Sequence, residues 1–156
     1  MTIKLKKNLK AFSLLEVVVT VGILSIVIAG LLQLFIYGQI SAEESEDLTR
    51  AMIEAQGKME EIRDHSFAQI AADYISGGTP GDTFALNGVT GSGLIYLDAS
   101  NADLIQVDIV ISFQTAKNRI IGEDVNFNGD LDMGEDFNGN GRIDSTANLS
   151  SLVARR

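Results

Sequence analysis

The chain has 156 residues and a formal net charge of −9, a length that suits one domain of ordinary size. It has no cysteine and one histidine, His65, which excludes disulfides, thiolate metal sites and a multi-histidine zinc site. The acidic balance argues against nucleic acid as a partner, because binding to phosphates needs a basic face. Hydrophobic residues make up 46% of the chain and aromatic residues only 6%, which is typical of a membrane segment attached to a lightly built domain.

The N-terminal region combines a basic start with a long apolar run. Residues 1–11 carry four lysines and no acid, and 26 uncharged residues separate Glu16 from the next charged residue, Glu43. A helix of this length would reach roughly 39 Å, whereas a bilayer core is about 30 Å thick. The lysines are expected to stay in the cytoplasm, so the sequence predicts a single membrane span with the C-terminal part outside the cytoplasm.

Three interpretations of this region compete. A cleaved secretory signal fits the basic start and the small residues at 40–42, but the apolar run is about twice the usual length. A plain uncleaved anchor fits the length, but a carboxylate such as Glu16 costs about 2.5–3.5 kcal/mol at the middle of a membrane and less near an end. An anchor gains nothing from this carboxylate, so the third interpretation has to explain it.

The junction from Lys10 to Glu16, with the sequence KAFSLLE, resembles the cleavage and methylation site of type IV prepilins and type II secretion pseudopilins. The resemblance implies that prepilin peptidase removes the leader, residues 1–11. Phe12 then becomes the methylated first residue and Glu16 the fifth. Ala11 departs from the glycine that usually precedes the cut, although alanine is also small. The resemblance further implies that Glu16 pairs with the Phe12 amine of a neighbouring subunit, since an unpaired charge in hydrocarbon is expensive.

The same resemblance implies a structural protein and not an enzyme. It predicts a minor pilin or pseudopilin in the inner membrane, with its N-terminus cytoplasmic before assembly and its bulk in an extracytoplasmic filament afterwards. The implied partners are other pilin or pseudopilin subunits, prepilin peptidase, an inner-membrane assembly platform and the membrane, with no nucleic acid. The implied segments are a leader (1–11), a transmembrane and assembly helix (12–42) and a pilin-like domain (43–156).

Beyond the apolar run the sequence turns polar but keeps a helical period. Apolar residues recur at steps of three and four from Leu48 to Ile62, forming one stripe. No proline interrupts residues 1–79, so one helix is expected from about Phe12 to near His65.

The second half of the chain has the pattern of a small sheet. Residues 77–93 contain six glycines and the only proline, which indicates loops and turns. Residues 105–113 alternate between apolar and wetter positions and form the strongest predicted strand. Shorter strands are expected at 94–97, 119–121 and 149–154. These elements predict an α+β fold in which a long N-terminal helix packs on a small antiparallel sheet of three or four strands.

Residues 123–144 form an acidic loop with seven acids, one base and a local net charge of −6. The loop repeats internally, because EDVNFNG recurs twelve residues later as EDFNGNG. The first copy fits the EF-hand calcium pattern, in which alternate oxygen ligands converge around a glycine turn and a distant glutamate closes the site. Its candidate ligands are Asp124, Asn126, Asn128, Asp130 (through its carbonyl), Asp132 and Glu135.

The second copy is a weaker match to the same pattern. Its candidate ligands are Asp136, Asn138, Asn140 and Asp144. Position twelve is Ala147, which cannot bind a metal, so the site is partial unless a carboxylate comes from the neighbouring copy. Hard oxygen ligands favour calcium over zinc or copper, and we expect a structural calcium cofactor in this loop. An alternative function is therefore a membrane-anchored or secreted calcium-binding module that does not assemble into filaments.

Overall fold

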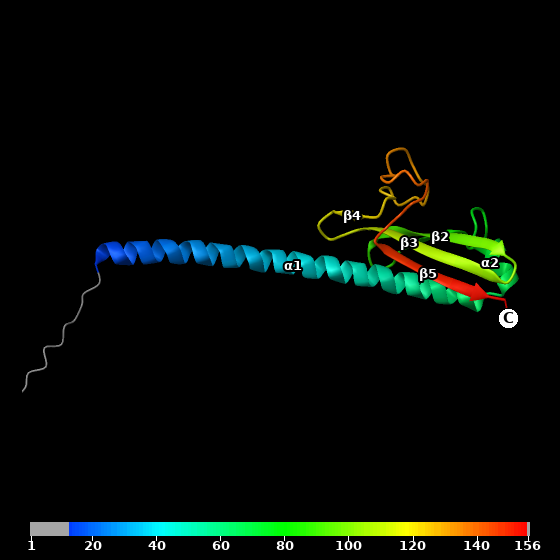
Figure 1. The fold of residues 1–156 in the computed structure, drawn as a ribbon, viewed down its shortest axis with the longest axis horizontal. Helices are drawn as coiled ribbons and strands as arrows, with labels where there is room; N and C mark the ends of the chain where they lie inside the picture. Colours follow the sequence, from blue (N-terminus) through cyan, green and yellow to red (C-terminus); the bar gives the residue numbers. More distant parts are fainter. Residues whose placement is uncertain (1–12, 156) are drawn as a thin grey trace, which may run out of the picture. The chain divides into compact units, whose positions relative to one another are not determined.

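The computed structural model describes residues 13–155, so the predicted leader with Ala11, and Phe12, lie outside the described residues. The chain divides into two compact units, Met1–Ser41 and Ala42–Arg156. Helix α1, Leu14–Asp64, begins in the first unit and ends in the second (Figure 1). The predicted long N-terminal helix is therefore confirmed, with both ends within two residues of the expected ones.

In the first unit, the start of α1 has its polar groups satisfied locally. The hydroxyl of Ser13 accepts a hydrogen bond from the N–H of Glu16 (3.2 Å), which caps the helix. The hydroxyls of Thr20 and Ser25 donate to carbonyls four residues earlier. These hydroxyls therefore do not need water, which suits a helix in an apolar environment.

The second unit uses the apolar stripe of α1 to build its core. The residues of this stripe that are fully buried are Ala51, Ala55, Met59 and Ile62. A short helix α2, Phe67–Asp73, follows and adds Ile70 to the same core. The sequence did not predict α2, because its seven residues span only two helical turns and give too few periods to recognise.

The sheet has five strands, all paired antiparallel: β1 Thr83–Ala85, β2 Thr90–Asn101, β3 Leu104–Gln114, β4 Ile120–Ile121 and β5 Ala147–Ala154. The first four follow one another in the order β1-β2-β3-β4. Strand β5 pairs with the first part of β3, and β4 pairs with its last two residues. The α+β fold with a helix on a small antiparallel sheet is confirmed, with one strand more than the upper expected number.

The face of the sheet that packs on α1 carries the main core. The alternating residues of β3 predicted to be buried are all at most 1% exposed: Ile105, Val107, Ile109, Ile111 and Phe113. They meet the helix stripe, together with Ile95 of β2 and Ala147 of β5. Burial of apolar side chains from three strands and α1 thus holds the second unit together.

The opposite face of the sheet is only partly open to solvent. Leu94 and Val110 form a second buried cluster with Ile143, which comes from the acidic loop. The N–H of Ile143 donates to the hydroxyl of Tyr96 on the same face (2.8 Å). Because Ile143 covers Val110, that residue is 6% exposed, although the sequence predicted a wetter position there.

Strand β2 begins earlier than the sequence predicts, inside the glycine-rich stretch. A Cβ at Gly93 would lie 2.1 Å from Cζ of Phe84 on the neighbouring strand β1. Glycine here permits close approach of a ring to the backbone and does not make a turn. The compositional signal for a loop at 77–93 was therefore wrong for the residues that belong to β1 and β2.

Candidate functional site

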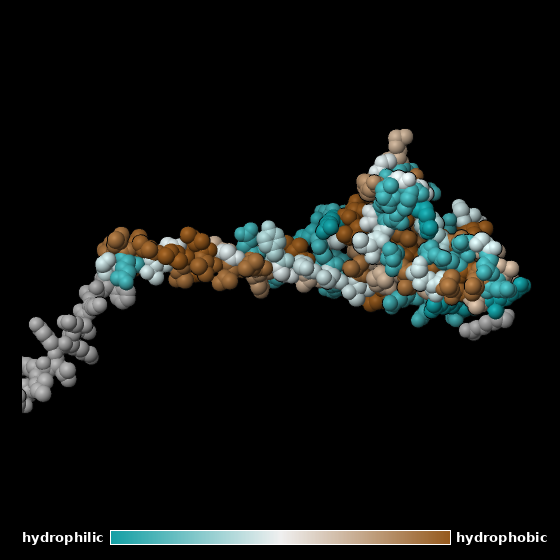
Figure 2. All heavy atoms as spheres, viewed as in Figure 1, coloured by the Kyte–Doolittle hydropathy of each residue, from teal (hydrophilic) through white to brown (hydrophobic). Residues whose placement is uncertain are grey.

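The first unit is an apolar helical surface that the rest of the chain does not cover. Large apolar side chains from Leu14 to Tyr37 are all exposed by about half or more, and they appear as the brown region at the start of the helix in Figure 2. Helix α1 is long and apolar enough to cross a membrane. This composition fits the single-pass anchor that is typical of prepilins.

Glu16 lies in the first turn of this surface, where its side chain is exposed. An acid in the first turn of a helix interacts favourably with the positive end of the helix dipole. Within residues 13–155, no basic side chain forms an ion pair with Glu16. Its expected partner, the amine of Phe12, lies outside the described residues.

The first copy of the acidic loop is organised around Asp124, which is only 1% exposed. Its Oδ1 accepts the N–H of Asn128 (3.1 Å), and its Oδ2 accepts the N–H of Gly129 (2.9 Å) and the hydroxyl of Ser92 on β2 (2.7 Å). The loop therefore wraps around this carboxylate and is attached through it to the sheet. The left-handed conformation at Gly129, with φ of 81°, makes the wrapping turn.

Glu135 closes the first copy at its other end. It is buried, its Oε1 accepts the N–H of Val125 (2.9 Å) and its Oε2 accepts the N–H of Asp132 (3.0 Å). Between these ends, the side-chain amides of Asn126 and Asn128 donate to Oδ2 of Asp132, at 2.7 and 3.0 Å. The side chains at positions one, three, five, nine and twelve are therefore drawn together, either directly or through shared backbone groups.

The second copy repeats this arrangement nearly bond for bond. Asp136 accepts the N–H groups of Asn140 (3.1 Å) and Gly141 (2.9 Å), as Asp124 does in the first copy. The amides of Asn138 and Asn140 donate to Oδ2 of Asp144, at 2.7 and 2.6 Å. Asp130 differs, because position seven of the second copy is Arg142. In both copies the N–H of position seven donates to the side chain of position five.

The carboxylate that the second copy lacks at position twelve is replaced by Glu123. Its Oε1 accepts the N–H of Phe137 (3.2 Å), and its Oε2 accepts the N–H of Asp144 (2.9 Å). These donors are positions two and nine of the second copy, the same positions that Glu135 bridges in the first. Each glutamate thus precedes one copy in the sequence and closes the other in space. Glu123 is also buried.

Sequence reasoning missed Glu123, although the repeat contained a signal for it. Glu123 immediately precedes Asp124, as Glu135 immediately precedes Asp136, so the two glutamates are twelve residues apart. A linear pattern assigns Glu135 to position twelve of the first copy but leaves no glutamate after the second. Only the reciprocal folding of the two copies brings Glu123 to that place.

The loop oxygens can be judged by their number and chemistry. Across residues 13–155, no three side chains of His, Cys, Asp and Glu stand in the geometry of a ready metal centre. Each copy nevertheless offers three carboxylates and two side-chain amides, a donor set of hard oxygens that suits calcium. The amide groups at positions three and five would need to present oxygen in place of nitrogen to the same point, a half-turn of each amide.

The comparison with known families gives one match. Residues 6–32 match the family described as the prokaryotic N-terminal methylation motif. No curated protein and no solved structure is significantly similar to this chain. The matched segment includes Phe12 and Glu16, the two residues on which the expected processing and assembly depend.

The motif and the fold together define the class of the protein as a prepilin of the type IV pilin-like kind. The motif at residues 6–32 is followed by an apolar helix that packs, at its far end, on a small antiparallel sheet. A protein of this class is a structural subunit, which implies processing by prepilin peptidase and assembly with other pilin subunits.

Proposed function

We propose that this chain is a minor pilin or pseudopilin of a type IV pilus or type II secretion filament. Prepilin peptidase cuts it between Ala11 and Phe12, and the new N-terminus is methylated. The protein enters the inner membrane with its N-terminus in the cytoplasm and joins a filament through the apolar part of α1. The observation that carries this proposal is the position of Glu16, the one charged residue in the apolar run, within the matched methylation motif.

The intact mass of the protein purified from its native membrane tests the processing step. We expect a mass that starts at Phe12 and includes one added methyl group. A mass that starts at Met1 or Thr2 would instead indicate a permanent anchor, and one that starts at Glu43 would indicate ordinary secretion. Either of these results would remove the basis for filament assembly.

The Glu16→Val variant tests the assembly step. Removal of the carboxylate leaves the Phe12 amine of a neighbour without its counter-charge, so we expect filament incorporation to fall at least about tenfold while membrane insertion is unchanged. Thr20→Val is the matched control, because it also replaces a polar residue on α1 but removes no charge. Equal incorporation of Glu16→Val and the unaltered chain would favour a calcium-binding module that does not assemble.

Calcium binding by the loop is the second part of the proposal. Support comes from the oxygen donor set, the glycine turns and the closure of each copy by one buried glutamate. Seven acids in 22 residues repel one another, so a divalent cation is expected to order the loop and to fix the connection from β4 to β5. We assign the first ion to Asp124, Asn126, Asn128, Asp130, Asp132 and Glu135.

The second ion, in this proposal, takes Asp136, Asn138, Asn140 and Asp144 together with Glu123. Titration calorimetry with calcium on the full chain in detergent should give two ions per chain. The Glu123→Gln variant should lose or weaken one ion, and Glu135→Gln the other, each by about tenfold or more, since the closing glutamate supplies two oxygens. Glu60→Gln, an exposed carboxylate on α1, is the control and should leave both ions unchanged.

Thermal unfolding with calcium and with a chelator completes the test. A ligand that binds only the folded state at 100 times its Kd stabilises it by about 2.7 kcal/mol. We therefore expect a higher melting temperature in calcium, and a smaller rise in either glutamate variant. Identical melting temperatures in calcium and in chelator would refute the structural calcium and would leave the pilin assignment untouched.

A further inference from the structure

Strand β5 is an edge of the sheet without the usual protection. It pairs with β3 on one side, and no strand within residues 13–155 pairs with its other side. Its eight residues, ANLSSLVA, include no charge and no proline, and its pairing with β3 has no register shift. Natural proteins normally protect an open edge by lysine, proline or a bulge, because its free N–H and C=O groups invite pairing with another chain.

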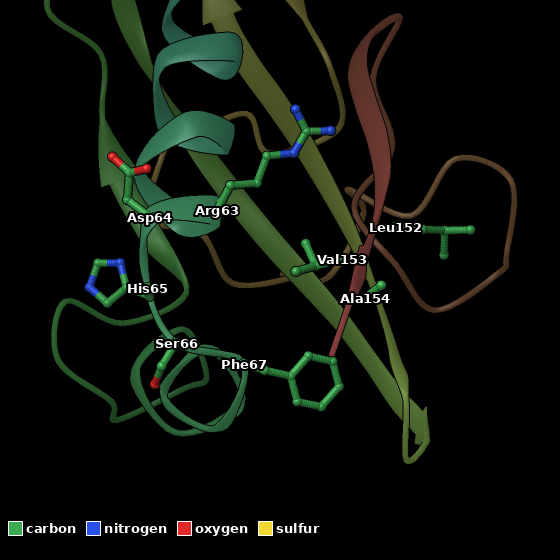
Figure 3. A pocket seen from close by; sticks show the side chains of 8 residues that line it. All are labelled: Arg63, Asp64, His65, Ser66, Phe67, Leu152, Val153 and Ala154. Atoms are coloured by element: carbon green, nitrogen blue, oxygen red, sulfur yellow. The ribbon is translucent and has the colours of Figure 1, made fainter. Parts of the chain in front are cut away.

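A groove runs along this edge between β5 and the helices of the second unit. Its main part is a cavity of about 780 Å³, lined by residues 63–67 on one side and 152–154 on the other (Figure 3). A smaller hollow of about 180 Å³ continues it toward Leu149, between β5 and α1. Arg63 lines both, so an extended segment placed beside β5 would pass this side chain.

The groove is bordered by two arginines without acidic partners. The five other Lys and Arg side chains of residues 42–155 each form an ion pair with a carboxylate, whereas Arg63 and Arg155 form none in the described part of the chain. Arg63 extends toward β5 and donates to the hydroxyl of Ser151, while Asp64 points away from β5 (Figure 3). The guanidinium of Arg155 lies over the ring of Phe67, 5.9 Å from its centroid. In an otherwise acidic chain, this border favours a negatively charged partner.

A second copy joined edge to edge does not fit this surface. Residues 56–59 of α1 lie beside Leu149, and residues 63–67 lie beside 152–154, so α1 and β5 run in the same direction (Figure 1). Antiparallel pairing of β5 with another β5 would point the two α1 helices in opposite directions. Copies anchored in one membrane with the same orientation cannot meet in that way.

We propose that β5 and this groove bind an extended, carboxylate-bearing segment of a different protein subunit as an additional strand. Backbone hydrogen bonds to the free edge of β5 would supply affinity, as in other cases of strand addition. Salt bridges from Arg63 and Arg155 to carboxylates of the segment would set its register. The uncovered side chains of residues 152–154 would contact its apolar positions.

A peptide probe tests this surface on the full chain in detergent micelles. The probe is a blocked eight-residue peptide of alternating threonine and valine with one glutamate near each end. A matched peptide has lysine in place of both glutamates. We expect the glutamate peptide to slow amide hydrogen exchange in β5, measured by NMR, and to bind more weakly as salt increases. The lysine peptide should bind at least about fivefold more weakly.

The double variant Arg63→Gln with Arg155→Gln should weaken the glutamate peptide at least about fivefold. The control, Arg50→Gln with Lys117→Gln, removes the same charge from elsewhere in the unit and should bind like the unaltered chain. Exchange slowed in β1, the other edge, and not in β5 would overturn the proposal. Equal affinity for both peptides, or an unchanged affinity in the correctly folded Arg63 and Arg155 variant, would do the same. None of these outcomes bears on cleavage at Phe12.

Discussion

The two copies of the acidic loop share a sequence pattern but differ in their attachment to the sheet. Asp124 of the first copy is 1% exposed and accepts the hydroxyl of Ser92 on β2. Asp136 of the second copy is only half-buried and accepts hydrogen bonds from its own loop. The second copy is attached instead through its last residues, where Ile143 is buried against the sheet and Arg142 lies over the ring of Tyr96.

This difference shows how one local motif can serve two structural purposes. The first copy is fixed to the sheet by a buried carboxylate, so its polar network is part of the fold. The second copy is fixed by an apolar side chain and a cation, so its carboxylates stay nearer to solvent. The reciprocal glutamates, Glu123 and Glu135, then join the two copies into one unit.

Replacement of the first carboxylate in each copy should give the largest contrast. Asp124→Ala leaves Ser92 and two backbone N–H groups without an acceptor in a buried place, so we expect a loss of about 3 kcal/mol of stability in chelator. Asp136→Ala exposes its donors to water and should cost about 1 kcal/mol. Chemical denaturation followed by circular dichroism measures both. Equal losses would mean that attachment to the sheet adds nothing to the first copy.

The glycines at position six give the next contrast. Gly129 and Gly141 have similar positive φ angles of 81° and 75°. A Cβ at Gly129 would lie 2.4 Å from Cγ2 of Thr83, whereas a Cβ at Gly141 would meet nothing within 4 Å. We expect Gly129→Ala to cost about 2–3 kcal/mol and Gly141→Ala about 1 kcal/mol, because only the first adds a clash to the backbone strain. Similar melting temperatures for the two variants would contradict this difference.

The smallest expected effect concerns the ion pair that holds the second copy. Arg142 lies 3.6 Å from Asp108 on β3. Partial burial raises the pKa of Asp108, but hydrogen bonds from Ser150 and Gln106 and the charge of Arg142 outweigh it, so the pKa lies below its ordinary value. A pKa that is lowered by folding stabilises the protein above the unfolded pKa of about 3.9, and this stability is lost as the pH falls through the folded pKa.

Asp108→Asn should therefore lower the free energy of unfolding at pH 7 by about 0.5–1 kcal/mol, the range of a largely exposed pair. The difference between this variant and the unaltered chain should shrink as the pH falls below 4. Denaturation series at pH 7 and pH 3 measure it. A difference that stays constant between these two pH values would show that the charge of Asp108 does not contribute.

Several parts of the molecule could be predicted from the sequence because their signals are local. The long helix follows from a continuous apolar and then amphipathic period without proline, and β3 from strict alternation over nine residues. The methylation segment is a short contiguous pattern, and the match at residues 6–32 confirms the resemblance of that segment. The calcium ligands also form a local pattern, and calcium binding by them stays a prediction.

Tertiary structure decided the features that depend on contacts between distant residues. Gly93 belongs to a strand because the ring of Phe84 occupies the space of a side chain. Val110 is buried because Ile143 returns from the loop to cover it. Glu123 closes the second copy because the two loops fold against each other, and β5 remains an open edge because nothing else in residues 13–155 reaches it. Periodicity reveals which side chains share a face, but only packing determines which faces and edges are covered.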